Sequence, residues 1–288
     1  RKFLDIKNFN FNIINDFNKV NDRQANLINC SEEDIEINLG QVSSKIGKQA
    51  YISLEKAKDA LKNNFIDVLV TAPVNKSAIQ KSQKDFIGHT EYLEQNFKGQ
   101  ALMMMVSENI KIAFVTSHVP LAKVSEMITE KKIIDILSSM NNTLIQDFGI
   151  RKPKIAVIGL NPHAGENGVL GDEENKIIIP AIAKSKNNNL LAFGPYPADS
   201  FFTSSNLKKF DAILSMYHDQ GLTPFKTLSF SEGVNYTSGL NVVRTSPVHG
   251  TAFDIAGKNV ADPQSFRESV FLACKIIYPN KLISLMIK

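Results

Sequence analysis

The chain has 288 residues, 43% hydrophobic and 22% charged, which is the composition of a globular protein with one large domain or two ordinary ones. Its 33 basic and 29 acidic residues give a formal charge of +4, and because the basic residues are spread along the sequence, no nucleic-acid partner is expected. No apolar run approaches the roughly 20 residues of a membrane span, so no membrane partner is expected.

The sequence pattern that indicates secondary structure is weak over the first 40 residues and clear after them. Residues 1–40, rich in Asn and Phe, show only faint strand-like alternation. Over residues 41–61 apolar side chains recur every three or four positions, which predicts an amphipathic helix. The stretch "FIDVLVTAP" follows and indicates a buried strand that ends at Pro73.

The rest of the chain alternates short apolar runs with helical segments. Buried strands are predicted at "ALMMMV", "KIAFVTSH", "KIAVIGLNPH", "LLAFGP" and "DAILSMYH". Helices are predicted around 121–148 and 172–187, and a last helix from Pro263 to Tyr278 has proline in its first turn. Continuous apolar strands that alternate with helices predict an α/β fold whose parallel or mixed sheet is covered on both faces.

Polar motifs follow several of these strands directly: "VTAPVNK", "VTSHVPL", "IGLNPHAGE" and "SMYHDQG". In the last motif, a buried strand gives way to His218, Asp219 and Gln220, and then to a predicted turn at Gly221. Polar groups buried without partners cost about 1–3 kcal/mol each, so water or a ligand is expected to meet them. Ligands of open α/β sheets bind at the carboxyl ends of the strands, and we expect the site there.

The five histidines all stand in short polar motifs punctuated by glycine or proline: His89, His118, His163, His218 and His249. Three of them, at 118, 163 and 218, follow predicted strands and so can converge at one edge of a sheet. Neutral imidazole is a common metal ligand, and three protein ligands with one open position are typical of a catalytic site. Their long spacing leaves two readings open, a metal site and ordinary loop histidines.

Three basic residues, Lys76, Lys226 and Arg244, are predicted to lie in loops rich in Gly, Pro and Thr beside the histidines. This placement favours an anionic substrate, to which the amides of Asn161 and Asn235 could add hydrogen bonds. Neither a G-x-S-x-G elbow, a Walker loop nor a G-x-G-x-x-G fingerprint is present, and "GENGVLG" is interpreted as a loop.

Taken together, seven motifs resemble the family of 4-hydroxythreonine-4-phosphate dehydrogenases of pyridoxine biosynthesis, in family order over roughly residues 41–278: "VTAPVNK", "GHTEYL", "TSHVPL", "GLNPHAGENGVLGDEE", "GPYPADSFF", "YHDQGLTPFK" and "NVVRTSPVHGTAFDIAGK". The resemblance implies two α/β/α domains with a cleft between them, of the isocitrate/isopropylmalate dehydrogenase type. Residues 1–85 and 232–288 would form an outer domain with the NAD loop. Residues 86–231 would form a central domain with the metal ligands and the interface of a homodimer, whose active site is shared between subunits.

The resemblance also assigns roles to residues by motif. The implied ligands of a divalent metal (Zn, Mg or Co), contributed from both subunits, are His118, His163 and His218. The implied substrate contacts are His89, Thr90, Lys226, Asn235 and Arg244. Because "PVHGTAFDIAG" resembles the adenosine-binding loop of isopropylmalate dehydrogenases, the residues placed near NAD or NADP are His249, Gly250, Asp254 and Ile255.

The implied reaction is the oxidation by NAD of 4-phosphohydroxy-L-threonine to 2-amino-3-oxo-4-(phosphonooxy)butanoate. This product then loses carbon dioxide and gives 3-amino-2-oxopropyl phosphate for pyridoxal phosphate biosynthesis. Among the catalytic candidates, His218 would bind a metal that stabilises charge on the oxygen, and Asp219 would orient a ligand or relay a proton. Lys226 and a water on the metal both stay open as the general base.

Three alternative functions use parts of the same motif set. A sister dehydrogenase of another phosphorylated hydroxy acid, such as a four-carbon sugar-acid phosphate, would share metal, NAD and fold. A metal-dependent hydrolase or phosphatase would release phosphate without NAD, and a binding protein would keep the motifs without activity. Two cysteines, Cys30 and Cys274, share no motif spacing and no signal peptide is visible, which predicts buried thiols in a reduced compartment, the cytoplasm.

The resemblance has one gap, at the start of the chain. The family opens with a glycine-rich "GDPxGIGPE"-like segment, and nothing in residues 1–40 matches it. The chain also starts at Arg1 rather than at Met. We therefore expect a further N-terminal stretch; without it, one domain would lack an inner strand and cofactor binding would suffer.

Overall fold

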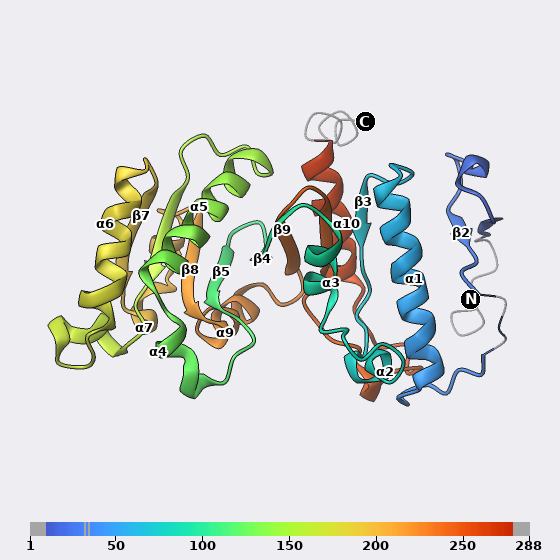
Figure 1. Ribbon diagram of the computed structural model, residues 1–288, viewed down its shortest axis with the longest axis horizontal. Helices are drawn as coiled ribbons and strands as arrows, with labels where there is room; N and C mark the ends of the chain where they lie inside the picture. The colour runs from blue at the N-terminus through green and yellow to red at the C-terminus, as the bar shows by residue number, and fades with distance from the viewer. Residues whose placement is uncertain (1–9, 32, 34, 279–288) are drawn as a thin grey trace.

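The structure is a computed structural model that describes residues 10–31, 33 and 35–278. A mixed sheet runs the length of the molecule, with helices on both of its faces, and the short parallel pair β1 (Asn12–Ile14) and β2 (Asn26–Ile28) lies at one end (Figure 1). Within the described residues the large sheet has the strand order β3-β10-β9-β4-β5-β8-β6-β7. Its strands are β3 (Val68–Val70), β4 (Gly99–Val106), β5 (Lys111–Thr116), β6 (Lys154–Ile158), β7 (Leu191–Tyr196), β8 (Ala212–Tyr217), β9 (Val234–Leu240) and β10 (Val243–Pro247).

The helices connect these strands and pack against them. The α-helices are α1 (Ser44–Lys62), α2 (Lys76–Gln80), α3 (His89–Asn96), α4 (Val124–Met127), α5 (Glu130–Gln146), α6 (Ile179–Asn187), α7 (Ala198–Phe201), α8 (Ser204–Leu207), α9 (His218–Ser229) and α10 (Gln264–Ile277). The tighter or wider turns are η1 (Phe17–Lys19), η2 (Leu121–Lys123), η3 (Pro162–Gly168), η4 (Glu174–Ile178) and η5 (Phe253–Ile255). Within the described residues, every helix is too short or too polar to span a bilayer.

Strand direction confirms the expected mixed α/β sheet. Neighbours β5, β8, β6 and β7 are parallel, as are β3 and β10, while β4 runs antiparallel to both β5 and β9. Because β5, β8 and β6 are adjacent and parallel, their carboxyl ends meet at one edge of the sheet.

Buried apolar side chains form three clusters. In the left half of Figure 1, Leu137 of α5 and Ile182 of α6 pack on one face of the sheet. Phe201 of α7 and Phe225 of α9 belong to a second cluster, with side chains of β5 and β8. A third joins α1, β3 and α3 and includes Leu93, which is fully buried. Burying each such side chain contributes about 1.5–3 kcal/mol, so the sheet and its helices form the frame that fixes the strand ends.

Several predicted elements end at other residues than expected. The first helix begins at Ser44, because the side chain of Ser43 accepts a hydrogen bond from the Ile46 amide and caps it. Pro263 is the N-cap of α10 and does not lie in its first turn. Strands β9 and β10 were not predicted.

The predicted turn at Gly221 was wrong. Gly221 lies buried inside α9, which starts directly after β8. A Cβ atom at this position would lie 2.5 Å from Ser215 Oγ and 2.9 Å from a ring carbon of Phe114. Glycine is therefore needed here for the close approach of α9 to the sheet and not for a turn.

Candidate functional site

Three histidines leave the sheet at the same edge. His218 follows β8 directly, His118 follows the adjacent strand β5, and His163 lies in η3 after β6. Thr116 of β5 and Tyr217 of β8 are paired in register, so the two strands end side by side. The prediction that polar motifs follow the carboxyl ends of strands is confirmed for all three.

Within one chain, two of these imidazoles come together. The ring centroids of His118 and His218 are 6.0 Å apart. The Nδ1 atom of His218 is 2.6 Å from Asp219 Oδ1, and the Nδ1 atom of His118 is 3.8 Å from Glu91 Oε1. Each ring thus turns Nδ1 to a carboxylate and leaves Nε2 for another partner. With metal–nitrogen distances of about 2.0–2.1 Å, two rings on one tetrahedral ion have centroids roughly 5 Å apart, and the observed pair is about 1 Å wider than this.

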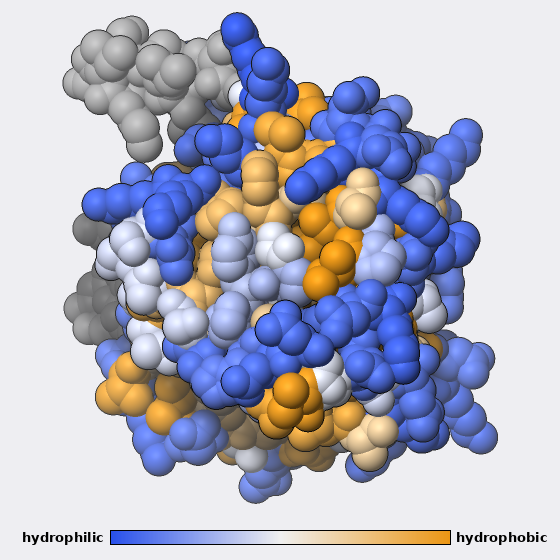
Figure 2. Space-filling view, turned by 90° about the vertical axis from the view of Figure 1, so that its left-hand side faces the viewer, coloured by the Kyte–Doolittle hydropathy of each residue, from blue (hydrophilic) through white to orange (hydrophobic). Residues whose placement is uncertain are grey.

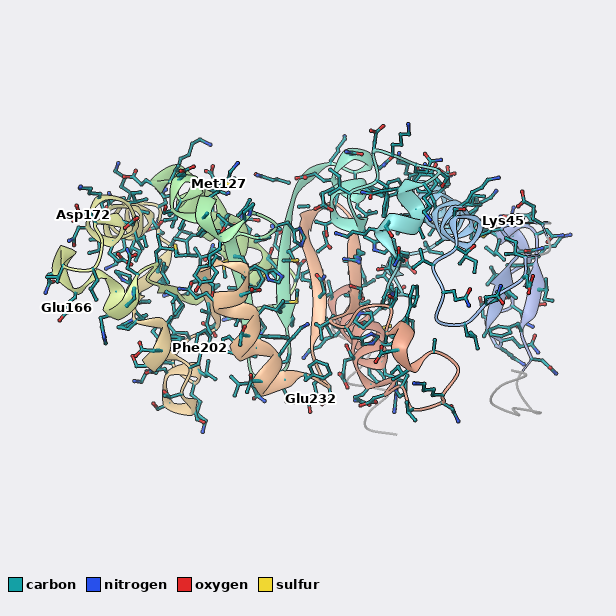
Figure 3. The ribbon with its side chains drawn as sticks, turned by 90° about the horizontal axis from the view of Figure 1, so that it is seen from below. Lys45, Met127, Glu166, Asp172, Phe202 and Glu232 are labelled. Atoms are coloured by element: carbon teal, nitrogen blue, oxygen red, sulfur yellow. The ribbon has the colours of Figure 1, made fainter. Side chains whose placement is uncertain are left out.

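His163 does not join this pair inside the chain. Across residues 10–31, 33 and 35–278, no three His, Cys, Asp or Glu side chains are grouped so that they could hold a metal ion. Figure 3 shows the labelled Glu166, from the same η3 turn, at the outer end of the molecule. The observed site is therefore a histidine pair, and the third expected ligand, His163, is an exposed residue of η3.

His163 lies in a left-handed turn. Five successive residues from His163 to Asn167 have φ angles between 43° and 80°, and four of them are not glycine. Each left-handed non-glycine residue costs roughly 1–2 kcal/mol, so this turn needs compensating contacts. Glu174, only 1% exposed, supplies three of them. It accepts hydrogen bonds from the amides of Leu160 and Asn161 and from the side chain of Asn161.

A buried cation forms the second part of the site. Arg244, 4% exposed, lies in strand β10 and not in the predicted loop. Its guanidinium donates from Nε and from one terminal nitrogen to Thr71 Oγ1, and from the other to Thr237 Oγ1. No carboxylate of the described residues forms an ion pair with it. Burial lowers the pKa of Arg244 to about 10. The nearby carboxylate of Glu91 opposes this shift, and the remaining N–H groups of the guanidinium suit an anionic ligand.

His89 faces this cation. It is the first residue of α3, and burial, followed by the positive charges of Arg244 and Lys76, lowers its pKa to about 3. The imidazole is therefore neutral at physiological pH and can both donate and accept a hydrogen bond. Thr90 is the next residue of the same turn. In β9, the Oδ1 atom of Asn235 is buried without a hydrogen-bond partner among the described residues, which suits a ligand donor.

Two predicted groups are not joined to this cluster. Lys226 lies two turns into α9, and not in a loop; no hydrogen bond or ion pair of the described residues links it to Arg244 or His89. The NAD-loop candidates follow β10: His249 Nδ1 lies 3.0 Å from the Gly250 carbonyl oxygen, and the other two, in η5, are Asp254 and Ile255.

Glu91 lies between the histidine pair and the buried Arg244, and it was not among the predicted site residues. Its Oε2 atom and Lys76 Nζ both lie beside Gly88, at 2.8 Å and 3.2 Å from where a Cβ would be, while Oε1 faces His118. The contact with His118 is the largest of the effects that lower the pKa of Glu91. The motif "GHTEY" contained the signal, an acidic residue two positions after a site histidine. A cavity of about 340 Å³ between α1 and α3 also has Glu91 on its wall, beside the histidine pair rather than at it.

Comparisons with known proteins agree on one family. The family model described as "Pyridoxal phosphate biosynthetic protein PdxA" matches residues 1–273. A 4-hydroxythreonine-4-phosphate dehydrogenase from Bacteroides thetaiotaomicron is 44% identical over 278 residues, which cover 96% of this chain and 76% of that protein. Another from Sulfurihydrogenibium sp. is 43% identical over 242 residues, with 83% and 74% covered.

Solved structures show the same relationship. The crystal structure of a 4-hydroxythreonine-4-phosphate dehydrogenase from Klebsiella pneumoniae has a TM-score of 0.81 and 32% identity, with 94% of this chain and 82% of that chain covered. A terephthalate 1,2-cis-dihydrodiol dehydrogenase from Burkholderia xenovorans LB400 has a TM-score of 0.59 and 25% identity, with 82% and 75% covered.

Proposed function

The chain belongs to the PdxA family of pyridoxal phosphate biosynthetic proteins, and on this premise we propose that it oxidises 4-phosphohydroxy-L-threonine with NAD or NADP. The proposed product is 2-amino-3-oxo-4-(phosphonooxy)butanoate, which decarboxylates to 3-amino-2-oxopropyl phosphate. Its curated relatives in Bacteroides and Sulfurihydrogenibium carry the name of this dehydrogenase. None of the relatives described above is named as a metal-dependent phosphatase.

The observation that carries the proposal is the buried guanidinium of Arg244. A buried charge without a direct ion-pair partner is costly. Glu91 acts on this charge from nearby, and a phosphorylated or carboxylated substrate would supply the direct partner. Neutral His89 and the unpartnered Asn235 Oδ1 can form hydrogen bonds with the hydroxyl or amino group of the same substrate. Thr90 and Lys226 complete the proposed substrate contacts.

The residues that would hold a divalent cation, Zn, Mg or Co, are His118 and His218, whose rings are neighbours at the carboxyl ends of β5 and β8, together with His163. The cation held there would supply Lewis-acid polarisation of the substrate hydroxyl, and NAD or NADP would supply the hydride acceptor. Asp219 holds the tautomer and orientation of His218 through Nδ1, and Glu91 lies 3.8 Å from the corresponding atom of His118. Lys226 is the proposed proton acceptor among the protein groups.

We further propose a homodimer that completes the site, because only two of the three histidines meet within one chain. The end of the molecule that carries η3 and α6 has exposed apolar side chains at Val169, Leu170, Ile179 and Leu191, of which Val169 is the most exposed at 76%. Figure 2 shows apolar surface gathered on this face. Edge strand β7 also ends the sheet here, so a second copy could cover both.

The cofactor loop and the domain division are proposals of the same kind. NAD or NADP would lie against His249, Gly250, Asp254 and Ile255, on the loop that follows β10. Residues 1–85 with 232–288 and residues 86–231 would form two domains of the isocitrate dehydrogenase type with a cleft between them. The free thiols of Cys30 and Cys274 fit a reduced compartment such as the cytoplasm.

A second candidate is a sister dehydrogenase with another substrate, favoured by the likeness to the terephthalate dihydrodiol enzyme. The test follows NAD reduction with 4-phosphohydroxythreonine and with a four-carbon sugar-acid phosphate, each with and without a chelator. Turnover of the first substrate alone, abolished by the chelator and by His218→Ala, is the expected result. Turnover only of the second would replace the proposed substrate, and full metal content in His218→Ala would remove His218 from the metal site.

A further inference from the structure

We infer that Glu174 is a positioning residue for His163, because it holds the left-handed turn that sets where this imidazole lies. The inference deepens the proposed function and rests on it, since a fixed His163 matters for catalysis only if it serves the metal site. Glu174 contacts Asn161, but no hydrogen bond among the described residues links it to His89, Asn235 or Arg244. Its effect is exerted through the backbone of residues 160–168.

The contacts of Glu174 are those of a built support. The side chain is 1% exposed at the start of η4. One oxygen accepts from the amides of Leu160 and Asn161, at 2.7 Å and 2.8 Å, and the other accepts from Asn161 Nδ2 at 2.9 Å. A carboxylate that takes up three N–H groups fixes the chain just before His163. Hydrogen bonds to a charged acceptor are about twice as strong as neutral ones, so this buried carboxylate is a strong anchor.

The turn itself depends on this anchor. Its residues are held in a region of backbone space that L-amino acids avoid, and a free segment of this sequence would leave it. Gly165, at φ 80°, is packed so closely that a Cβ atom would lie 2.6 Å from Glu174 Oε2. The Glu174 carboxylate therefore hydrogen-bonds to the chain just before the turn and also packs against Gly165 inside it. Strained backbone persists only where the surrounding contacts hold it in place. In this turn, those contacts fix the position of the His163 side chain.

The neighbouring residue offers a matched control. Glu173 also contacts the turn, but through a single hydrogen bond from Asn161 Nδ2 at 2.8 Å. Replacing it with glutamine changes the charge by the same amount, in the same helical turn, and leaves the two backbone amides bonded. A second test variant, Gly165→Ala, disturbs the turn from the other side and keeps the carboxylate.

The experiment compares the full chain with Glu174→Gln, Glu173→Gln and Gly165→Ala. Amide hydrogen exchange of residues 160–170 reports on the turn, and equilibrium dialysis with Co²⁺ reports on the ligand set. We expect Glu174→Gln and Gly165→Ala to exchange faster in this segment alone and to bind Co²⁺ about 10–100-fold more weakly. Their kcat should recover at saturating metal, which a general loss of folding would not allow. Glu173→Gln should behave like the native protein.

Two results would overturn the inference. Either exchange in residues 160–170 stays native in Glu174→Gln, or it rises while Co²⁺ affinity and kcat stay native. If the native protein itself binds no Co²⁺ and oxidises no substrate, the proposed function fails. In that case the exchange data, together with the sharpness of the His163 ring signal in NMR spectra of native protein and Glu174→Gln, still decide whether Glu174 fixes this side chain.

Discussion

The guanidinium of Arg244 shows how a single buried residue can define the chemistry of a site. Its planar fork is held by two threonine hydroxyls, so its orientation is set before any ligand arrives. A lysine could keep the charge at this position but not the paired donors. The geometry of the fork, as well as its charge, is therefore expected to determine affinity for the anionic group.

Arg244→Lys should raise KM for the phosphorylated substrate by roughly 10–100-fold, because one or more charge-assisted hydrogen bonds worth about 1.5–3 kcal/mol are lost. The effect on kcat should be smaller. Steady-state kinetics with varied substrate measure both, and Arg267→Lys on the exposed surface of α10 is the matched control. A native KM in Arg244→Lys would remove Arg244 from the substrate site.

His89 gives a prediction with a defined sign. Its folded-state pKa of about 3 lies below the ordinary value of 6.5, so the unfolded chain takes up a proton first as the pH falls. The contribution of His89 to stability is therefore present above pH 6.5 and is lost between pH 6.5 and 3.

His89→Gln should make stability fall less steeply with acidification, by at most about 1.4 kcal/mol per pH unit and by less in practice, because the ring is partly exposed. Urea unfolding at a series of pH values measures the slope. His249→Gln, in the loop after β10, is the control. Parallel curves for native protein and His89→Gln would show that burial does not hold this imidazole neutral.

At the scale of elements, the packing of α1 on α2 depends on one glycine. A Cβ atom at Gly47 would lie 2.3 Å from the carbonyl oxygen of Ala78, a contact that no side chain tolerates. Alanine is the better helix former by about 1 kcal/mol, so helix propensity and packing oppose each other here. The steric effect should win, because the obstacle is backbone.

Gly47→Ala is expected to destabilise the fold by about 1–3 kcal/mol, the usual cost of overpacking. Chemical unfolding measures the change. Gly250→Ala serves as control, since a Cβ atom there meets nothing within 4 Å. Equal or higher stability of Gly47→Ala would mean that α1 and α2 can separate without loss.

Helices and strands with apolar sequence patterns were predicted correctly, and strands rich in polar residues were not predicted. The spacing of apolar residues over 41–61 predicted α1, and the buried runs predicted β3 to β8, because side-chain periodicity follows burial. Strand β10 reads as a loop because Arg244, Thr245 and Ser246 are polar. They are nevertheless buried, with partners elsewhere; Thr245 Oγ1, for example, donates to the Ser269 carbonyl oxygen. Such partners lie far along the chain, and the sequence alone does not reveal them.

The candidate site likewise contains residues that the sequence predicted and residues that it did not. The histidines could be placed at strand ends because parallel strands share an edge. The support by Glu174 could not be foreseen, since a left-handed turn in "HAGEN" follows from a carboxylate several residues away and not from local preference. Glu91 was missed for a related reason: its role depends on where α3 lies relative to β5.

At the scale of the whole molecule, the two halves of the sheet are joined by β4 and β9, which lie in the middle of Figure 1. The hydroxyl of Tyr236 in β9 donates to Asp147 Oδ2, at the end of α5, over 2.7 Å. This hydrogen bond ties a helix of one half to the central strands. Burial raises the pKa of Asp147, which the Tyr236 hydrogen bond opposes.

Tyr236→Phe should destabilise the protein by about 1.5–3 kcal/mol at neutral pH, since an ionised, partly buried carboxylate loses its donor. The deficit should shrink as the pH falls through the raised pKa of Asp147, because a protonated carboxyl needs the donor less. Tyr278→Phe, whose hydroxyl meets Asp67 at the surface, is the matched control. A deficit that does not change with pH would contradict this account.

The pairing of β3 with β10 has a consequence for how the chain is made. Val68 and Val243 are partners in the sheet, although nearly two-thirds of the described chain separates them. A ribosome that adds about 5–20 residues per second needs roughly 10–35 s to deliver the second strand after the first. Throughout that interval the apolar side of α1 and β3 has no finished sheet to cover it. Nascent chains of this protein should therefore depend on chaperones most strongly before β10, which ends at Pro247, has been synthesised.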